Sequence, residues 1–329
     1  MKFAEIIIKP LSAFGTPLKG DTIFGHFYWQ LVYDPSLLKG DLQRLTETYG
    51  HEPFVVFSSA FPRLREGWLL PRPALPLRYF GFETSGEDCF EKLKGLKEQK
   101  KKSWLLASSL ALDLTRPELL NDAEAAARLA SEEGLGFHGD TPRSLVIESP
   151  QPHNTINRLT FTTGEGFAPY QLRNHWFLPG MRLSVFVLYR EEVLKLSSIR
   201  EAFSRIGETG FGRDASCGLG RFAVEEIREL PLPKPGRVLY TLSPYVPREE
   251  DYEHIWYRPF TRFGRHGGPL VLTGRPFKNP VFMADQGAVL RASVERGPYI
   301  GRAIGGLSKA EEKTIAQGFS IVLPVEGLA

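Results

Sequence analysis

Residues 207–222 read GETGFGRDASCGLGRF, with five glycines in the fourteen residues 207–220. An amphipathic stretch at 191–206 predicts a helix before this segment, and 221–227 predicts a strand after it. Glycine permits positive φ and lets a backbone approach a ligand closely, and successive N–H groups then bind phosphate oxygens. We therefore predict a phosphate-binding loop, with a mobile turn as the alternative. Its candidate residues are Gly210, Gly212, Arg213, Ser216, Gly218, Gly220 and Arg221.

The order helix, loop, strand excludes two familiar motifs. A dinucleotide-binding fingerprint follows a strand and opens a helix, and a P-loop needs Gly-Lys followed by Ser or Thr. The segment is neither of these.

Strand and helix patterns alternate on both sides of the loop. Strands are predicted at 3–9, 53–60, 143–148, 158–163, 182–189, 238–242, 256–262, 288–292 and 319–323, with an irregular hairpin at 62–79. Helices are predicted after an Asp21 N-cap, at 87–101, 104–113 and 117–133, and at 308–317 behind a Ser308/Glu311 capping box.

This alternation predicts an α+β fold of two ferredoxin-like (RRM-like, βαββαβ) domains. The first would span residues 1–230, with a helical insertion at about 86–133 and the glycine-rich loop at 207–220. The second would span 235–329. Proline at every second position of 231–235 predicts a stiff linker between them.

Composition narrows the class of protein. Hydrophobic residues make up 42% of the 329 residues, which is typical of a globular chain. Two distant cysteines, Cys89 and Cys217, argue against a zinc ribbon and a disulfide scaffold, and we expect neither a metal nor a cofactor. No apolar run suits a signal peptide or a membrane span, so we expect a cytoplasmic protein without a membrane partner.

Charge is distributed unevenly along the chain. Residues 1–142 carry 17 basic and 19 acidic residues, for −2, whereas 143–329 carry 24 and 19, for +5. The second part also holds 19 of the 26 arginines but five of the 15 lysines. The arginine guanidinium matches phosphate and stacks on bases, so the pattern favours a polyanionic partner, with ordinary surface charge as the alternative.

Three further segments contain candidate nucleic-acid contacts. Residues 152–164 lack acids and offer His153, Asn154 and Arg158, which suits single-stranded RNA, although a polar strand edge is the alternative. Residues 258–284 also lack acids and interleave phenylalanines with Arg262 and Arg265, a pattern of single-strand binding; a core of aromatics with solvated arginines is the alternative. The connection before the first helix adds Ser12, Thr16 and Lys19 near a helix N-terminus, which favours anions.

Enzyme signatures are scarce. The chain has no G-x-S-x-G, no H-E-x-x-H and no carboxylate cluster for metal-dependent phosphoryl transfer. One alternative is an RNA-cleaving enzyme with His26 as general acid, but its apolar neighbours favour a packed histidine. A magnesium-dependent nuclease using Asp21 is a weaker alternative, because Asp21 stands where a helix cap is expected.

Taken together, the segments 3–9, 15–26, 152–163, 210–222 and 318–325 resemble the RAMP superfamily of CRISPR proteins. Within this superfamily the chain looks most like the family of the fourth subunit of the type III-A (Csm) effector complex. The equivalent subunit of type III-B complexes is the family with which it is most easily confused. The resemblance implies two ferredoxin-like folds and a non-catalytic, RNA-binding role in antiviral defence. It also implies three partners, which are the 5′ handle of the crRNA, the large polymerase/cyclase-like subunit and a backbone RAMP subunit. It implies nothing about the 86–133 block.

Overall fold

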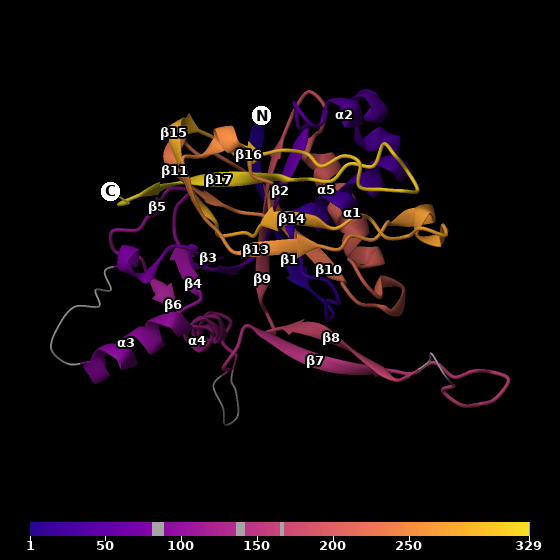
Figure 1. Cartoon of the computed structure of the whole chain (residues 1–329), viewed down its shortest axis with the longest axis horizontal. Coiled ribbons are helices and arrows are strands. Elements are labelled where there is room, and N and C mark those ends of the chain that lie inside the picture. Colours follow the sequence, from indigo (N-terminus) through magenta and orange to yellow (C-terminus); the bar gives the residue numbers. More distant parts are fainter. Residues whose placement is uncertain (81–88, 136–141, 165–167, 329) are drawn as a thin grey trace.

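The structure is a computed structural model that describes residues 1–80, 89–135, 142–164 and 168–328. Its largest element is a seven-stranded sheet in the order β10-β1-β9-β2-β3-β4-β6 (Figure 1). The strands are β1 (Lys2–Pro10), β2 (Val55–Leu64), β3 (Gly67–Pro71), β4 (Trp104–Ala107), β6 (Leu119–Leu120), β9 (Arg182–Tyr189) and β10 (Phe222–Leu230).

Helices α1 (Gly20–Tyr33) and α5 (Leu196–Thr209) pack on this sheet. Their apolar faces supply Phe27 and Phe203, whose rings contact Phe57 of β2 at centroid distances of 5.0 and 5.6 Å. The chain therefore passes β1, α1, β2 and later β9, α5, β10. The glycine-rich segment lies at the end of α5, next to the edge strand β10.

A second sheet has the order β12-β15-β11-β17-β16 and contains the last strand of the chain. Its strands are β11 (Gly236–Thr241), β12 (His254–Trp256), β15 (Val289–Arg296), β16 (Tyr299–Gly301) and β17 (Phe319–Glu326), and β5 (Leu112–Asp113) pairs with β17 in parallel. Two separate two-stranded ribbons are β7 (Val146–His153) with β8 (Tyr170–Phe177), and β13 (Pro259–Arg262) with β14 (Val281–Ala284). The remaining helices are α2 (Leu42–Thr48), α3 (Cys89–Lys101) and α4 (Asp122–Glu132). None of the helices in the described ranges is long and apolar enough to cross a membrane.

The two sheets share the larger of two hydrophobic cores and are also joined by a buried amide. Gln317 is fully buried just before β17. Its Oε1 accepts from the N–H of Phe57 at 2.8 Å, and its Nε2 donates to the carbonyl of Phe57 at 2.7 Å. These bonds satisfy the backbone of β2 at the point where its pairing with β9 is irregular.

A buried carboxylate links several strands of the large sheet through its hydrogen bonds. The Glu5 side chain of β1 is 0% exposed. Its oxygens accept from Arg63 Nη1 at 2.9 Å, Trp68 Nε1 at 2.7 Å and Ser184 Oγ at 2.6 Å, and from Arg228 Nε at 2.8 Å. Because these donors come from β2, β3, β9 and β10, one side chain connects five strands of the sheet.

Four predicted elements are wrong. The single strand expected at 256–262 is instead β12 and β13, which belong to different sheets. Residues 104–113 form strands β4 and β5 instead of a helix, because they extend the sheets beyond β3 and β17. Residues 158–163 form a tight turn instead of a strand, and 308–317 contain no helix. Of the predicted helix 87–101, residues 87 and 88 lie outside the described ranges, and the rest is α3.

Other predictions are confirmed. Strands were expected at 3–9 and 182–189, and the structure has β1 and β9 there, the latter with the predicted bounds. The helix at 191–206 is α5, shifted to Leu196–Thr209, and strand 221–227 is β10. The α+β class is confirmed, with mostly antiparallel sheets.

Candidate nucleic-acid interface

The glycine-rich loop is docked on the connection that leads from β1 to α1. The N–H of Gly212 donates to His26 Nε2 at 3.1 Å, and the N–H of Arg213 donates to Thr16 Oγ1 at 2.9 Å. Gly212 has φ +79°, and a Cβ there would lie 2.4 Å from the Cβ of Thr16. Glycine is therefore needed at 212 for close approach of two backbone segments of this chain.

The second half of the loop is held in the same way. Gly220 N–H donates to the carbonyl of Ala13 at 2.7 Å, and Arg221 N–H donates to Ser12 Oγ at 2.9 Å. The N–H of Gly218 bonds to the carbonyl of Ala215 at 3.0 Å. The expectation that the loop glycines present free amides is therefore wrong, since the N–H groups of Gly210, Gly212, Gly218 and Gly220 all donate within the chain. The N–H groups of Arg213 and Arg221, two residues predicted for their charge, are bonded as well. Ser12 and Thr16 likewise position the loop.

The part of the loop that solvent reaches is its outer turn. Ser216 and Cys217 are exposed, and Gly218 has φ +89° with open space beside its α-carbon. The side chain of Arg221 is also exposed and has no ion-pair partner among the described residues. These groups are accessible to a ligand. Because the loop amides are bonded within the chain, the charge of Arg221 is what this turn offers to a phosphate.

The side chain of Arg213 holds three segments together. Its Nε donates to the carbonyl of Gly15 at 3.2 Å, and its Nη2 donates to Asn174 Oδ1 at 2.9 Å and to the carbonyl of Arg173 at 2.8 Å. Arg213 was predicted as a phosphate contact. The structure uses its guanidinium mainly to fix the loop against β8, a strand that the sequence patterns did not predict.

His26 lies under the loop, where it cannot serve as an acid near neutral pH. Its ring packs against Phe211 with centroids 4.4 Å apart, and its Nε2 accepts from Gly212. Burial lowers the pKa of His26 from 6.5 to about 4. The imidazole is therefore neutral and engaged, as the packed-histidine interpretation predicts.

The pKa of His26 predicts a pH-dependent stability. Above pH 6.5 the residue is neutral in both the folded and unfolded chain, and between 6.5 and about 4 only the unfolded chain takes up the proton. Stability is therefore lost as the pH falls through this window, by roughly 2–3 kcal/mol at its lower end. His26→Gln keeps an acceptor for Gly212 but cannot titrate. We expect urea unfolding of this variant to depend less on pH than that of the wild type between 6.5 and 4, and parallel curves would contradict the assignment.

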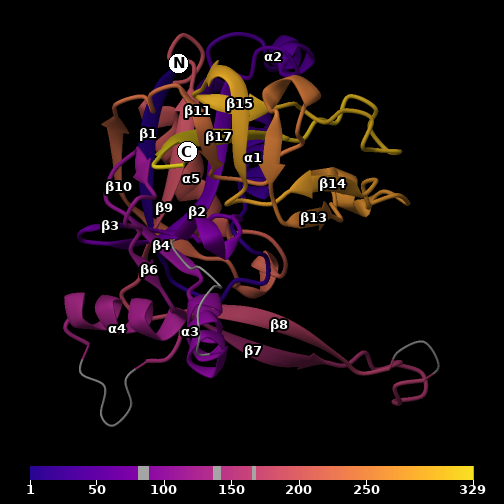
Figure 2. The same ribbon diagram turned by 60° about the vertical axis from the view of Figure 1, so that its left-hand side comes forward.

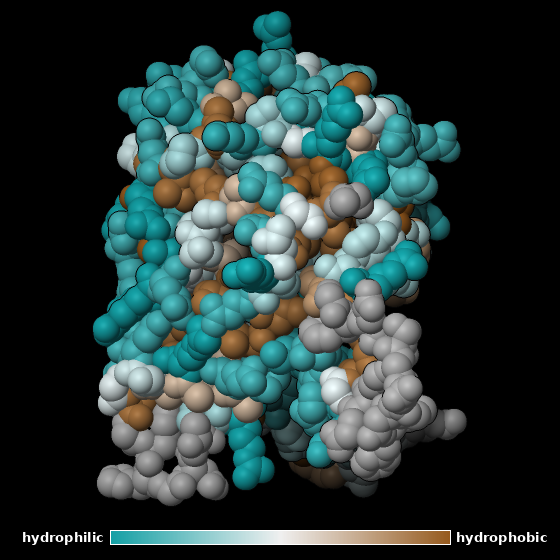
Figure 3. Space-filling view, turned by 90° about the vertical axis from the view of Figure 1, so that its left-hand side faces the viewer, coloured by the Kyte–Doolittle hydropathy of each residue, from teal (hydrophilic) through white to brown (hydrophobic). Residues whose placement is uncertain are grey.

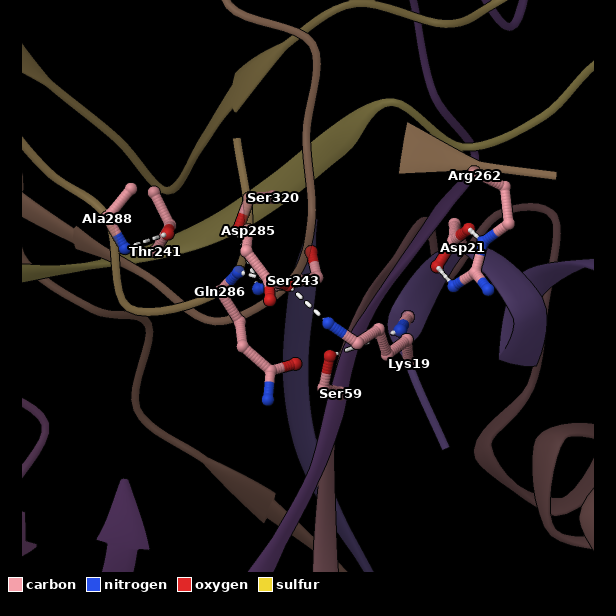
Figure 4. A network of polar contacts seen from close by, with 11 residues as sticks. Lys19, Asp21, Ser59, Thr241, Ser243, Arg262, Asp285, Gln286, Ala288 and Ser320 are labelled. Atoms are coloured by element: carbon pink, nitrogen blue, oxygen red, sulfur yellow. Dashed lines mark hydrogen bonds and ion pairs between the residues drawn. The ribbon is translucent and has the colours of Figure 1, made fainter. Parts of the chain in front are cut away.

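Two predicted cations, Lys19 and Arg262, are paired within the chain (Figure 4). Arg262 of β13 donates to both oxygens of Asp21 at 2.6 and 2.9 Å, and Lys19 pairs with Asp285. The expected N-cap role of Asp21 is wrong, because Lys19 is the N-cap residue and Asp21 is the second residue of α1. Since its carboxylate is bound by Arg262, Asp21 is not available as a metal ligand either.

The ribbon β7–β8 carries the candidates of the 152–164 segment. His153 stacks on Tyr170 with centroids 5.2 Å apart near the end of the ribbon, whereas Asn154 and Arg158 are exposed beyond it. A turn held by Asn157 exposes Leu159 and Phe161, which are 91% and 83% exposed. Arg158 has no ion-pair partner in the parts of the chain described here.

The candidate segments lie on one side of the molecule. In Figures 1 and 2 the β7–β8 ribbon and the loop beyond β13 and β14 project in the same direction, and the glycine-rich loop lies between them. Arg265, at the base of the β13–β14 loop, is exposed. The side turned away from these projections, which faces the viewer in Figure 3, is mostly hydrophilic with hydrophobic residues visible between the polar ones. Within the described ranges, no three His, Cys, Asp or Glu side chains gather in a way that suits a metal ion.

Comparison with solved structures places the fold. A chain in the crystal structure of a Csm1-Csm4 cassette in complex with pppApA matches 99% of this chain over 98% of its own length, with 18% identity and a TM-score of 0.55. A chain in the Csm3-Csm4 subcomplex of the type III-A CRISPR-Cas interference complex matches 98% of this chain over 99% of its length, with 13% identity and a TM-score of 0.55. No protein-family model and no curated protein matches the sequence. The likeness in fold to chains from Csm1-Csm4 and Csm3-Csm4 complexes is the likeness that the sequence resemblance predicted.

Proposed function

We propose that this chain is the RAMP subunit of a type III-A (Csm) CRISPR effector complex that binds the 5′ repeat-derived handle of the crRNA. In that complex it would join the large polymerase/cyclase-like subunit to a backbone subunit, as part of cytoplasmic antiviral defence. The observation that carries the RNA-binding role is the one-sided placement of the glycine-rich loop between two projecting ribbons. Arg158 and Arg265 on these ribbons are exposed and have no ion pair with any residue that the structure describes. The whole-chain likeness in fold to chains from Csm1-Csm4 and Csm3-Csm4 complexes supports the partners.

The proposal includes a division into two domains. The order β10-β1-β9-β2, with α1 and α5 as the connecting helices, supports a ferredoxin-like arrangement for residues 1–230. Residues 235–329 would form the second domain, built on β11, β15 and β17.

A non-catalytic role fits the site better than an RNA-cleaving one. A general acid must hold a proton near the operating pH and reach the leaving group. His26 is neutral, with its Nε2 bonded to the loop, and Asp21 is bound by Arg262. We therefore expect purified protein to bind repeat RNA in EDTA without cutting it. Cleavage that His26→Ala abolishes would support the enzyme instead.

Exposed arginines that form no ion pair within the described ranges predict a measurable salt dependence. Each phosphate contact with single-stranded RNA contributes about 0.7 to the slope of log K against log salt concentration. Arg158→Ala and Arg221→Ala should each reduce that slope by about 0.7 for handle RNA, measured by fluorescence anisotropy. The matched control is Arg116→Ala, an exposed arginine between β5 and β6. Unchanged slopes in both test variants would count against the site.

A further inference from the structure

The ribbon β13–β14 has two chemically different faces. Its strands pair antiparallel, with Thr261 opposite Phe282, and the ladder continues to a bridge between Arg265 and Phe277. Side-chain alternation along the first strand puts Thr261, Phe263 and Arg265 on one face. Their cross-strand partners lie on the same face, because Phe282 pairs with Thr261 and Phe277 pairs with Arg265, with a register shift of one residue between the two pairs. All five are exposed.

The opposite face holds the ribbon on the body of the protein. Arg262 binds Asp21, Met283 is 1% exposed, and Phe260 lies beneath the ammonium of Lys19 at 4.1 Å. Near the tip, Gly268 sits against the indole of Trp29, where a Cβ would lie 2.8 Å from the ring. The outward face is therefore presented by a ribbon that is fixed both at its strands and near its tip.

The outward face is aromatic to a degree that packing does not explain. Phe263, Phe277 and Phe282 are 78%, 70% and 60% exposed. They are three of the four exposed phenylalanines in the described part of the chain. An outward ribbon face in a water-soluble fold is ordinarily polar, so three rings on it indicate a contact surface.

The charge around these rings selects the kind of partner. Residues 258–284 contain no acidic side chain, and the guanidinium of Arg265 lies 5.9 Å from the centre of the Phe277 ring. Arg258 and Arg275 are exposed and have no ion pair with any described residue. Aromatic platforms beside unpaired cations match the bases and phosphates of single-stranded nucleic acid.

We infer that the outward face of β13–β14 binds single-stranded RNA by stacking unpaired bases on Phe263, Phe277 and Phe282, as a contact separate from the glycine-rich loop. This rests on the proposed function in so far as the ligand is RNA. Stacking is sequence-tolerant because every base has a π-face. The face would therefore hold RNA whatever its sequence.

The test compares Phe263→Ala/Phe277→Ala with Leu272→Ala, which removes an 87% exposed aliphatic side chain from the same loop. Each lost stack should weaken binding of single-stranded RNA by roughly five- to hundredfold, so the double variant should lose about 25-fold or more at fixed salt. The slope of log K against log salt concentration should be the same for the double variant as for the wild type. Leu272→Ala should change neither this slope nor the RNA affinity. The fluorescence of RNA that contains 2-aminopurine should be quenched when the RNA binds the wild type and should not be quenched when it binds the double variant. Thermal unfolding checks that the exposed substitutions leave the fold intact.

The outcomes separate this inference from the proposed function. Equal RNA affinity and equal quenching for the wild type and the double variant would overturn the stacking site and leave the proposed function standing. Absence of RNA binding by the wild type would overturn both. Retained RNA affinity with lost binding to a Csm1-type or Csm3-type subunit would show that the face docks a protein, which also overturns the inference.

Discussion

Replacing Glu5 with alanine should lower the free energy of unfolding by about 3–5 kcal/mol, as breaking a buried ion pair does. The substitution leaves the guanidinium groups of Arg63 and Arg228 without their carboxylate and the Trp68 indole N–H without its acceptor. The loss is large because the Glu5 side chain is fully buried and water cannot replace its hydrogen bonds. Urea unfolding followed by circular dichroism measures it.

Glu226→Ala is the matched control for this prediction. Glu226 also lies in a strand of the large sheet, but it is exposed and has no ion-pair partner in the described residues. Its removal should change stability by no more than about 0.5 kcal/mol. A Glu5→Ala variant that loses less than about 1 kcal/mol would show that the buried network is not a principal support of the sheet.

Gly212→Ala is the second substitution with a large expected effect. The new Cβ would meet Thr16 at 2.4 Å in a backbone with φ +79°, so the loop must separate from the β1–α1 connection. The bonds from Gly212 to His26 and from Arg213 to Thr16 would break with it. Strain and displacement together should cost on the order of 2–4 kcal/mol, and handle RNA should bind at least about tenfold more weakly.

Gly218→Ala separates steric clash from backbone strain. Gly218 has φ +89°, as unfavourable to alanine as φ at Gly212, but a Cβ there meets nothing within 4 Å. This variant should lose only about 1 kcal/mol and keep most of its RNA affinity. Equal losses in both variants would mean that loop docking on Thr16 does not matter for binding.

Sequence patterns were sufficient to predict an element where they favoured a strand over a helix clearly. The run RLSVFVLY predicted a strand, and β9 has those bounds because nearly all of its side chains are buried. Residues 104–113 failed the same test, because short apolar runs suit a helix or a strand equally and neighbouring strands decided the outcome. Local capping signals were also incomplete. Ser308 does accept from the N–H groups of Ala310 and Glu311, but the chain then runs on without forming a helix to place Gln317 against β2.

Sequence patterns selected the segments of the candidate site but not the contacts that their side chains make within the chain. The patterns identified the glycine-rich loop, the 152–164 segment and the 258–284 segment, which the fold places on one side. They could not show that Arg262 meets Asp21 across 241 positions, or that Lys19 meets Asp285 across 266. Such pairs leave no local signature in the sequence. Lys19 and Arg262 therefore looked available for phosphate in the sequence, although the structure pairs both within the chain. Phe263 and Phe277 were visible as aromatics, but only the strand register shows that they share an exposed face.

The amide of Gln317 and the strand that follows it have a consequence for biosynthesis. They complete the backbone pairing of β2 and β5, which the ribosome produces more than 200 residues earlier. At roughly 5–20 residues per second, the early sheet must wait ten seconds or longer for its last partner. During translation the nascent chain therefore leaves these backbone groups of β2 and β5 unpaired, and a chaperone, or an assembling neighbour, is in a position to cover them.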